Sequence, residues 1–321
     1  MRKTLEIFFL YSIVLFVTGC GETSTSEKDG AEEIEIALNW FPEAEHGGYY
    51  EALVNKHYGK ENLKIKIRSG GPGVPVLQQV ATSRIAYGVV NADDVLNAVS
   101  GGADIVAIFA PMQTNPRCIM VHKESNVEKI SDIKNMTLGM SARPSFRHWL
   151  LAKYKFENVK IVPYPPNIMV FLKNKKFAQQ AYNIAEPFTA RSKGANPKVL
   201  MLSDLGFNPY ASVLITTKKR IKERPEEVAA MVRASIIGWN NYVAQPEKAN
   251  LHIHSLNKEM PLDVLTFGAE ELKKLVKAID KNVPASGMIY ERWETLAKQL
   301  KEAKLIDLNE TKIRSAYYLV K

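Results

Sequence analysis

The sequence predicts an α/β protein of two lobes, joined by two extended crossing segments and followed by a helical C-terminal part. Short apolar strands alternate with helical patterns in two successive runs, which is typical of mainly parallel sheets with helices on their faces. Two extended apolar segments, residues 117–125 and 211–219, follow the first and the second run. The chain from residue 224 onward has helical periodicity. Two lobes joined in this way form a hinged clamp.

The first run predicts the strands and helices of the first lobe. Its last helix, at 93–102, is closed by a glycine pair, which is typical of helix C-termini. The other expected elements, in chain order, are a strand at 33–38, a helix at 49–59, a strand at 63–70, a helix at 74–83 and strands at 85–90 and 104–110.

The second run predicts a second α/β lobe. Its expected elements are strands at 136–141, 159–164, 181–187 and 198–204 and helices at 145–154, 168–180 and 188–194. The tail is expected to form helices at 225–245, 261–279 and 290–305. With the crossings as boundaries, lobe 1 comprises residues 34–115 plus 217–321, and lobe 2 comprises residues 116–216.

The N-terminal segment indicates export and lipid anchoring. A basic start precedes an apolar stretch, Ile7–Val17, which is too short to span a bilayer and is typical of a secretory signal. Small residues before Cys20 resemble a bacterial lipobox, in which this cysteine is lipidated and becomes the new N-terminus. Residues 1–20 are therefore expected to be a lipoprotein signal peptide, and residues 21–33 a flexible tether. The mature protein would lie outside the cytoplasm, anchored at the periplasmic face or the cell surface.

Composition excludes several classes of protein. Only one further cysteine, Cys118, is present, so neither an internal disulfide nor a four-cysteine zinc site can form once Cys20 is acylated. This cysteine lies in an apolar run and is expected to be buried. The net charge is +9, but basic residues are interleaved with acids and no nucleic-acid motif occurs. We expect no nucleic-acid partner, no metal and no resident cofactor.

Candidate ligand-binding residues lie where predicted strands end, because ligands of open α/β sheets bind beyond the carboxyl ends of the strands. The first such loop, at 38–50, is rich in aromatic and acidic residues and offers Asn39, Trp40 and His46. The second offers Gly70 and Gly71, whose backbone amides a ligand could approach; a tight strand-to-helix turn is an equal alternative. Glu43 and Glu45 are ambiguous and could belong to a solvated rim.

Three later strand ends supply further candidates. Asn91 would point into the mouth of the cleft, and Ser141 could donate a hydrogen bond to a ligand or cap a helix. Glu186 is expected at the end of a buried strand, where a lone carboxylate would be costly to desolvate. It would therefore pair either with a donor-rich ligand group or with Arg191. Tyr164 and Tyr210 complete the set of candidates.

Enzyme motifs are not found in the sequence. It contains neither a Gly-x-Ser-x-Gly elbow nor a His-Glu-x-x-His motif. His46, beside two glutamates, could act as a base, but no nucleophile or cofactor lysine is evident near it. We expect a binding protein and not an enzyme.

Five stretches together resemble the solute-binding lipoproteins of ABC importers in the thiamine-pyrimidine-precursor and sulfonate (ThiY/SsuA-like) family. They are "LNWFPEAEHGGYYEA", "GGPGVPV", "NADD", "NIAEPF" and "GFNPYASVLITT". The resemblance implies a type II periplasmic-binding-protein fold, a small-molecule ligand, and a membrane permease with a cytoplasmic ATPase as partners. It also implies that Trp40 stacks on a flat ring and that Glu186 receives amino groups of that ring.

Other functions stay open at this level. A sulfonate or nitrate ligand would prefer the amides near Gly70 and the side chain of Arg143, and riboflavin is bound by relatives of the same fold. Yeast pyrimidine synthases share the fold and consume a histidine placed like His46, but their cysteine-rich motif is absent here. A receptor that serves a sensor kinase would have the same sequence features.

Overall fold

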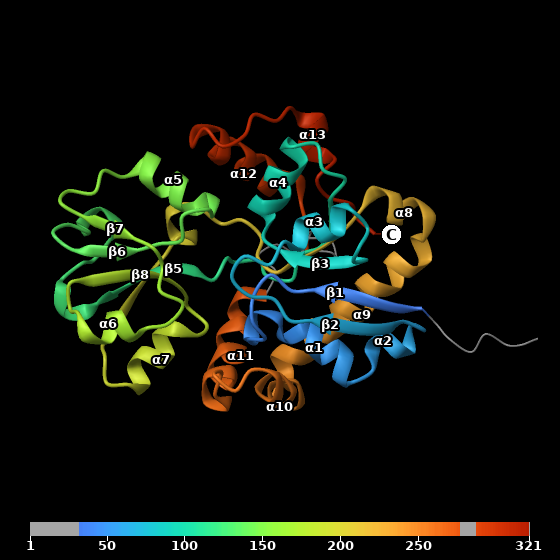
Figure 1. The fold of residues 1–321 in the computed structure, drawn as a ribbon, viewed down its shortest axis with the longest axis horizontal. Helices are drawn as coiled ribbons and strands as arrows, with labels where there is room; N and C mark the ends of the chain where they lie inside the picture. The colour runs from blue at the N-terminus through green and yellow to red at the C-terminus, as the bar shows by residue number, and fades with distance from the viewer. Residues whose placement is uncertain (1–31, 277–286, 321) are drawn as a thin grey trace, which may run out of the picture. The chain divides into compact units, whose positions relative to one another are not determined.

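A computed structural model describes residues 32–276 and 287–320. The predicted signal peptide, Cys20, most of the predicted tether and the end of the predicted helix at 261–279 lie outside the described residues. The described chain forms two five-stranded sheets with helices around them, as Figure 1 shows. Within this part of the chain, no helix has the length and apolar character needed to cross a membrane.

The first sheet has the strand order β2-β1-β3-β10-β4. Strand β1 runs parallel to both of its neighbours, with Ile36 opposite Ile67 on one side and Tyr87 on the other. Strand β10 is antiparallel to β3 and β4. The strands are β1 Glu33–Ala37, β2 Lys64–Arg68, β3 Tyr87–Val90, β4 Val106–Phe109 and β10 Val213–Thr216.

The second sheet has the order β7-β6-β8-β5-β9. Strand β6 is parallel to β7 and β8, and β5 is antiparallel to β8 and β9. The strands are β5 Arg117–His122, β6 Thr137–Gly139, β7 Lys160–Val162, β8 Phe177–Tyr182 and β9 Pro197–Met201. Each sheet thus contains one antiparallel strand, and in each case it is the segment predicted as a crossing.

The crossings therefore become part of the sheets. After β4 the chain passes directly into β5 of the second sheet, and after β9 it returns through residues 202–212 into β10 of the first sheet. The chain has consequently re-entered the first lobe by Val213. Cys118 lies on β5 and is completely buried.

Helices cover both sheets. Those of the first lobe and the tail are α1 Gly47–Val54, α2 His57–Lys60, α3 Val76–Ala81, α4 Ala92–Ser100, α8 Lys218–Glu223, α9 Pro225–Ala244, α10 Glu247–Leu256, α11 Leu262–Val276, α12 Tyr290–Glu302 and α13 Glu310–Arg314. Those of the second lobe are α5 Ser145–Lys153, α6 Met169–Lys173 and α7 Glu186–Ser192. Single 3-10 turns occur at Ala44–His46, Lys123–Ser125, Ile130–Asp132 and Ser203–Leu205.

Helices α1 and α9 approach each other closely because of glycine. A Cβ atom on Gly48 would lie 2.2 Å from Cγ of Trp239, and one on Gly238 would lie 2.3 Å from the carbonyl oxygen of Gly48. The glycine pair Gly47 and Gly48 directly precedes the helix predicted at 49–59, a position typical of a turn into a helix. Instead both lie within α1, where the lack of a side chain lets a large aromatic residue of α9 pack against the backbone.

Two predicted elements of the second lobe are wrong. The expected helix at 168–180 ends at Lys173, and residues 177–182 form strand β8 instead. The expected strand at 181–187 ends at Tyr182, and Glu186 is the first residue of α7. The physical reason is tertiary: β8 lies between β5 and β6 and bonds to both, and this pairing overrides a local pattern that suits a helix.

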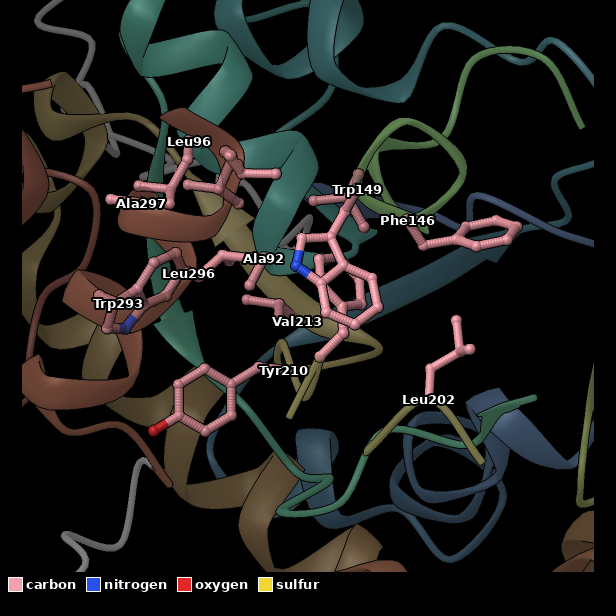
Figure 2. Close-up of a cluster of buried hydrophobic side chains, with 14 of the residues drawn as sticks. Ala92, Leu96, Phe146, Trp149, Leu202, Tyr210, Val213, Trp293, Leu296 and Ala297 are labelled. Atoms are coloured by element: carbon pink, nitrogen blue, oxygen red, sulfur yellow. The ribbon is translucent and has the colours of Figure 1, made fainter. Parts of the chain in front are cut away.

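One hydrophobic cluster includes residues of both lobes (Figure 2). Phe146 and Trp149 of α5 lie in it together with Leu96 of α4 and with Trp293 of α12. A hydrogen bond from Nδ2 of Asn97 to Oγ of Ser145, 3.0 Å long, also joins α4 to α5. A second cluster lies between the first sheet and α1, α9 and α11, and a third lies on β5 and β8 of the second sheet.

Candidate ligand-binding site

A cavity of about 180 Å³ lies between the two lobes. The first lobe contributes residues from the loop after β1 and the residue after β3, and the second contributes residues that follow β6 and β7 and residues on β5 and β8. This position agrees with the rule that open α/β sheets bind ligands at the carboxyl ends of their strands. The lining residues are Asn39, Trp40, Glu43, Glu45, Asn91, Arg117, Ser141, Pro144, Tyr164, Gln180, Ala181, Tyr182 and Glu186.

The structure places six of the ten candidate residues on this cavity: Asn39, Trp40, Asn91, Ser141, Tyr164 and Glu186. The other four, His46, Gly70, Gly71 and Tyr210, are not among the lining residues.

His46 lies behind the cavity wall and is completely buried. Its Nε2 atom is 3.0 Å from Oδ1 of Asn39, so the ring holds a residue that does line the cavity. Burial lowers the pKa of His46 to about 3, and a backbone hydrogen bond opposes this only in part. The imidazole is therefore neutral at physiological pH, and Nε2–H donates to the amide oxygen of Asn39.

Gly70 supports the first ligand loop from outside. Its backbone N–H donates to the carbonyl oxygen of Trp40 over 2.9 Å. A Cβ atom at Gly70 would lie 2.1 Å from the carbonyl oxygen of Leu38, so only glycine permits this approach. At Gly71 the same atom would meet only the ring edge of Phe41, at 3.2 Å.

Tyr210 belongs to the buried cluster between the lobes. Its hydroxyl accepts a hydrogen bond from the backbone N–H of Ile289, 3.0 Å away. The guanidinium carbon of Arg292 lies 3.8 Å from the centre of its ring. These contacts make it part of the packing beside the cavity.

Glu186 is held by two donors of its own lobe. The hydroxyl of Tyr164 donates to Oε1 and the backbone N–H of Tyr182 donates to Oε2, each over 2.9 Å. Burial raises the pKa of this carboxyl group, while these hydrogen bonds and the charge of Arg117 lower it. Each carboxylate oxygen retains a second lone pair for a ligand. The carboxyl group is thus fixed in orientation before any ligand arrives.

Trp40 offers a flat, partly exposed surface to the cavity. Its ring is packed edge to face against Phe41, with centroids 5.4 Å apart and an angle of 67° between the planes. Because the edge contact orients the indole without covering both faces, a planar ligand can stack on it.

Two glutamates that the sequence left ambiguous lie on the cavity. Glu43 and Glu45 are brought to it by the 3-10 turn Ala44–His46, and Glu45 is only 6% exposed. Burial raises the pKa of Glu45 to about 8, with Arg117 lowering it and Glu186 raising it. Burial also raises the pKa of Glu43 well above its usual range; the charges of Glu45 and Glu186 add to the effect, and a side-chain hydrogen bond from Trp40 opposes it.

Arg117 is the one arginine or lysine among the residues that line the cavity. Its Nη2 atom donates to the hydroxyl of Tyr182 over 3.0 Å. Its guanidinium carbon also lies 4.6 Å from the ring centre of Phe146 and 4.8 Å from that of Tyr182. The arginine is therefore held between aromatic rings by cation–π contacts.

Sequence reasoning missed Arg117, Gln180 and Tyr182 because they lie on strands and not in loops. Gln180 is paired with a predicted residue: its Oε1 accepts from the backbone N–H of Ser141 over 2.7 Å, and its Nε2 donates to the Ser141 hydroxyl over 3.1 Å. Gln180 and Tyr182 are two positions apart on β8 and therefore lie on the same face of the strand, but "FAQQAY" does not alternate between polar and apolar residues, so no local pattern indicated this face.

Comparison with known proteins places the chain among binding proteins. It is 23% identical to the formylaminopyrimidine-binding protein of Halalkalibacterium halodurans over 310 residues, which covers 93% of each chain. It is also 23% identical to the riboflavin-binding protein RibY of Chloroflexus aurantiacus over 261 residues, or 74% of each chain.

A solved structure with a similar fold is the periplasmic aliphatic sulphonate binding protein SsuA from Escherichia coli. The TM-score is 0.70 at 15% identity, covering 91% of this chain and 94% of that one. The expected periplasmic-binding-protein fold is thereby confirmed. The profile of the NMT1/THI5-like family matches residues 43–249, well over half of the chain. The protein belongs to the NMT1/THI5-like family.

Proposed function

We propose that the protein is the extracytoplasmic solute-binding component of an ABC importer and that it captures a small, planar nitrogen heterocycle such as an aminopyrimidine. The observation that carries the proposal is the arrangement of Glu186, whose carboxylate is oriented by Tyr164 and Tyr182 in the same cavity as the Trp40 ring. An aromatic face and a fixed carboxylate together suit a flat ring with an amino group beside a ring nitrogen.

The acidic lining argues against anionic ligands. A sulfonate or nitrate in this cavity would meet the carboxyl groups of Glu43, Glu45 and Glu186. Its only countercharge among the lining residues would be Arg117, which already donates to Tyr182. The Gly70 amide, which an anion could have used, donates to Trp40 instead. Riboflavin, the ligand named for one relative, stays the second candidate and belongs in the same panel.

The position of His46 supports a binding protein over a pyrimidine-forming enzyme. The ring is completely buried, lies outside the set of lining residues and is hydrogen-bonded to Asn39. A histidine that served as a substrate would have to leave this place, and Asn39 would then lose the donor that orients it.

Lipidation of Cys20 and delivery to a membrane permease complete the proposal. The signal-like segment and the small residues before this cysteine support it. Expression of the full chain in a bacterial host, followed by mass spectrometry of the N-terminus, should show a diacylglyceryl-modified Cys20 and loss of residues 1–19. Cys20→Ala should lack the diacylglyceryl group and retain residues 1–19.

Isothermal titration against an aminopyrimidine, riboflavin, an alkanesulfonate and nitrate tests the ligand class. The aminopyrimidine should bind, and Trp40→Ala should weaken that binding by about 1–2 kcal/mol, the usual worth of an aromatic stacking contact and its buried area. Glu157→Gln, an exposed carboxylate outside the cavity, is the control and should bind normally. Binding of the sulfonate or nitrate alone would overturn the proposal.

A further inference from the structure

The cavity contains more carboxyl groups than recognition of an aminopyrimidine edge requires. Glu186 supplies the carboxylate for that edge, yet Glu43 and Glu45 line the same space of about 180 Å³. Within residues 32–276 and 287–320, neither glutamate forms an ion pair with Arg117, whose Nη2 donates to Tyr182 instead. If both glutamates ionise, Arg117 is the one basic side chain among the lining residues that could balance their charge.

The carboxyl group of Glu45 is buried and has no hydrogen-bond donor among the described residues. The residue is only 6% exposed and faces the cavity; its backbone carbonyl accepts a hydrogen bond from the Ser212 hydroxyl, but its carboxyl group accepts none from the described residues. The nearest basic atom is Nε2 of His46 at 3.5 Å, and that nitrogen donates to Asn39 from a neutral ring. A buried carboxylate in this state is costly unless a partner arrives from the cavity.

We infer that Glu43 and Glu45 form a cation subsite, so that the preferred heterocycle carries a positively charged substituent. The inference rests on the proposed function and names the charge of its ligand. A substituent of the alkylammonium class fits, because it offers three donors and a full charge to two carboxylates.

The groups that face the pair come from several elements. Arg117 on β5 favours ionisation of Glu45, and Glu186 on α7 opposes ionisation of both glutamates. Asp93 and Asp94 on α4 and Tyr182 on β8 act on Arg117. Helix α11 meets the 3-10 turn through Gly268, which lies against Ala44 and bears no charge. In the ligand-free protein, the sum of these effects favours the protonated forms of Glu43 and Glu45.

The proton balance of binding follows from this arrangement. The free cavity holds Glu45 as a carboxylic acid at neutral pH, since burial raises its pKa to about 8. When an ammonium group enters, the carboxylate becomes the favoured form and its proton passes to the buffer. The affinity for a cation should then fall about tenfold for each pH unit below 8. A neutral analogue gains nothing from this ionisation.

The test compares two ligands of the same shape. A 4-aminopyrimidine with a 5-aminomethyl group is a cation, and its 5-hydroxymethyl analogue is neutral. Titration calorimetry is carried out at pH 6, 7 and 8 in two buffers of different ionisation enthalpy. At pH 8 the cation should bind at least tenfold more tightly than the neutral analogue. The titrations should also show release of up to one proton for the cation only.

The isosteric variants Glu45→Gln and Glu43→Gln separate the subsite from the rest of the cavity. Each should reduce the preference for the cation, and Glu45→Gln should flatten its pH dependence, while both still bind the neutral analogue. Melting curves verify that the variants are folded. The number of protons that the wild type releases on binding the cation is measured without either variant.

The outcomes distinguish the inference from the proposed function. Equal binding of both ligands without proton release would overturn the cation subsite and leave the pyrimidine proposal intact, provided that Trp40→Ala still weakens binding. A neutral ligand that binds more tightly than the cation would also overturn the subsite. Failure of both pyrimidines to bind would overturn the inference and the proposed function together.

Discussion

Replacement of Glu186 by Gln removes the charge from the proposed recognition edge while preserving the shape of the side chain. In the wild type the carboxylate accepts from the Tyr164 hydroxyl and from the Tyr182 backbone N–H, each over 2.9 Å. A glutamine can offer its single oxygen to only one of these donors, and its NH₂ group must then face either the other donor or the ligand.

The expected loss of affinity follows from the type of bond that is removed. A hydrogen bond to a charged group contributes about 1.5–3 kcal/mol, so Glu186→Gln should weaken aminopyrimidine binding by roughly 10–150-fold. Tyr164→Phe removes one of the two orienting donors and should cost about 1 kcal/mol, or about fivefold. Because Tyr164 acts through the carboxylate, the double variant should bind no more weakly than Glu186→Gln alone.

Isothermal titration at pH 8 measures all four proteins of this cycle, and melting curves establish that each is folded. Binding by Glu186→Gln within twofold of the wild type would refute the assignment of the recognition edge. Additive losses in the double variant would refute the positioning role of Tyr164 and would indicate that the tyrosine contacts the ligand independently.

Four further predictions concern packing, ligand binding and pH. Gly48→Ala should destabilise the protein by about 1–3 kcal/mol, because the added methyl group would lie 2.2 Å from Cγ of Trp239, and urea unfolding measures the loss. The control is Gly59→Ala, whose added methyl group would have its nearest neighbour 3.9 Å away; it should leave the urea-unfolding midpoint unchanged or raise it. Gly70→Ala should weaken ligand binding by displacing the carbonyl group of Leu38, whereas Gly71→Ala, which meets only the edge of Phe41, should bind within about twofold of the wild type in the same titration. A pKa of Glu45 raised to about 8 means that the ligand-free native state retains a proton which the unfolded chain releases, so the contribution of this group to stability should fall as pH rises from 5 to 8, and Glu45→Gln should remove that fall. The lowered pKa of His46 acts in the opposite direction, because the unfolded chain binds the proton first, and it should cost stability as pH falls from 6.5 towards 3. The two contributions oppose each other below pH 6.5, so the Glu45 effect should be visible from pH 6.5 to 8. Melting temperatures of the wild type and of Glu45→Gln that change equally over that interval would contradict the Glu45 prediction.

The first ligand loop could be predicted from the sequence because ligands of open α/β sheets bind beyond the carboxyl ends of the strands. Trp40, Asn91 and Ser141 each follow a short apolar strand, and parallel strands bring such positions to one edge of a sheet. Glu186 was selected as well, although it begins a helix and does not end a strand. Strand β8 ends a few residues earlier than predicted, but Glu186 still lies near its carboxyl end and on the cavity.

The rest of the site depended on long-range contacts. Arg117 and Gln180 are presented by β5 and β8, and the face that each strand turns to the cavity is set by its sheet neighbours. His46 was expected to contact the ligand, but the 3-10 turn directs it inward to Asn39 and leaves Glu45 on the cavity. No local pattern in "PEAEH" distinguishes these directions, since adjacent residues of a tight turn point to different sides.

The hydrophobic cluster that includes α4, α5 and α12 affects how the protein unfolds. Phe146 and Trp149 belong to the second lobe, yet they share this cluster with Leu96 and Trp293 of the first lobe. Neither lobe can melt without exposing apolar surface that the other one covers. The two halves should therefore denature as a single cooperative unit, and either half produced alone should be insoluble or only partly folded.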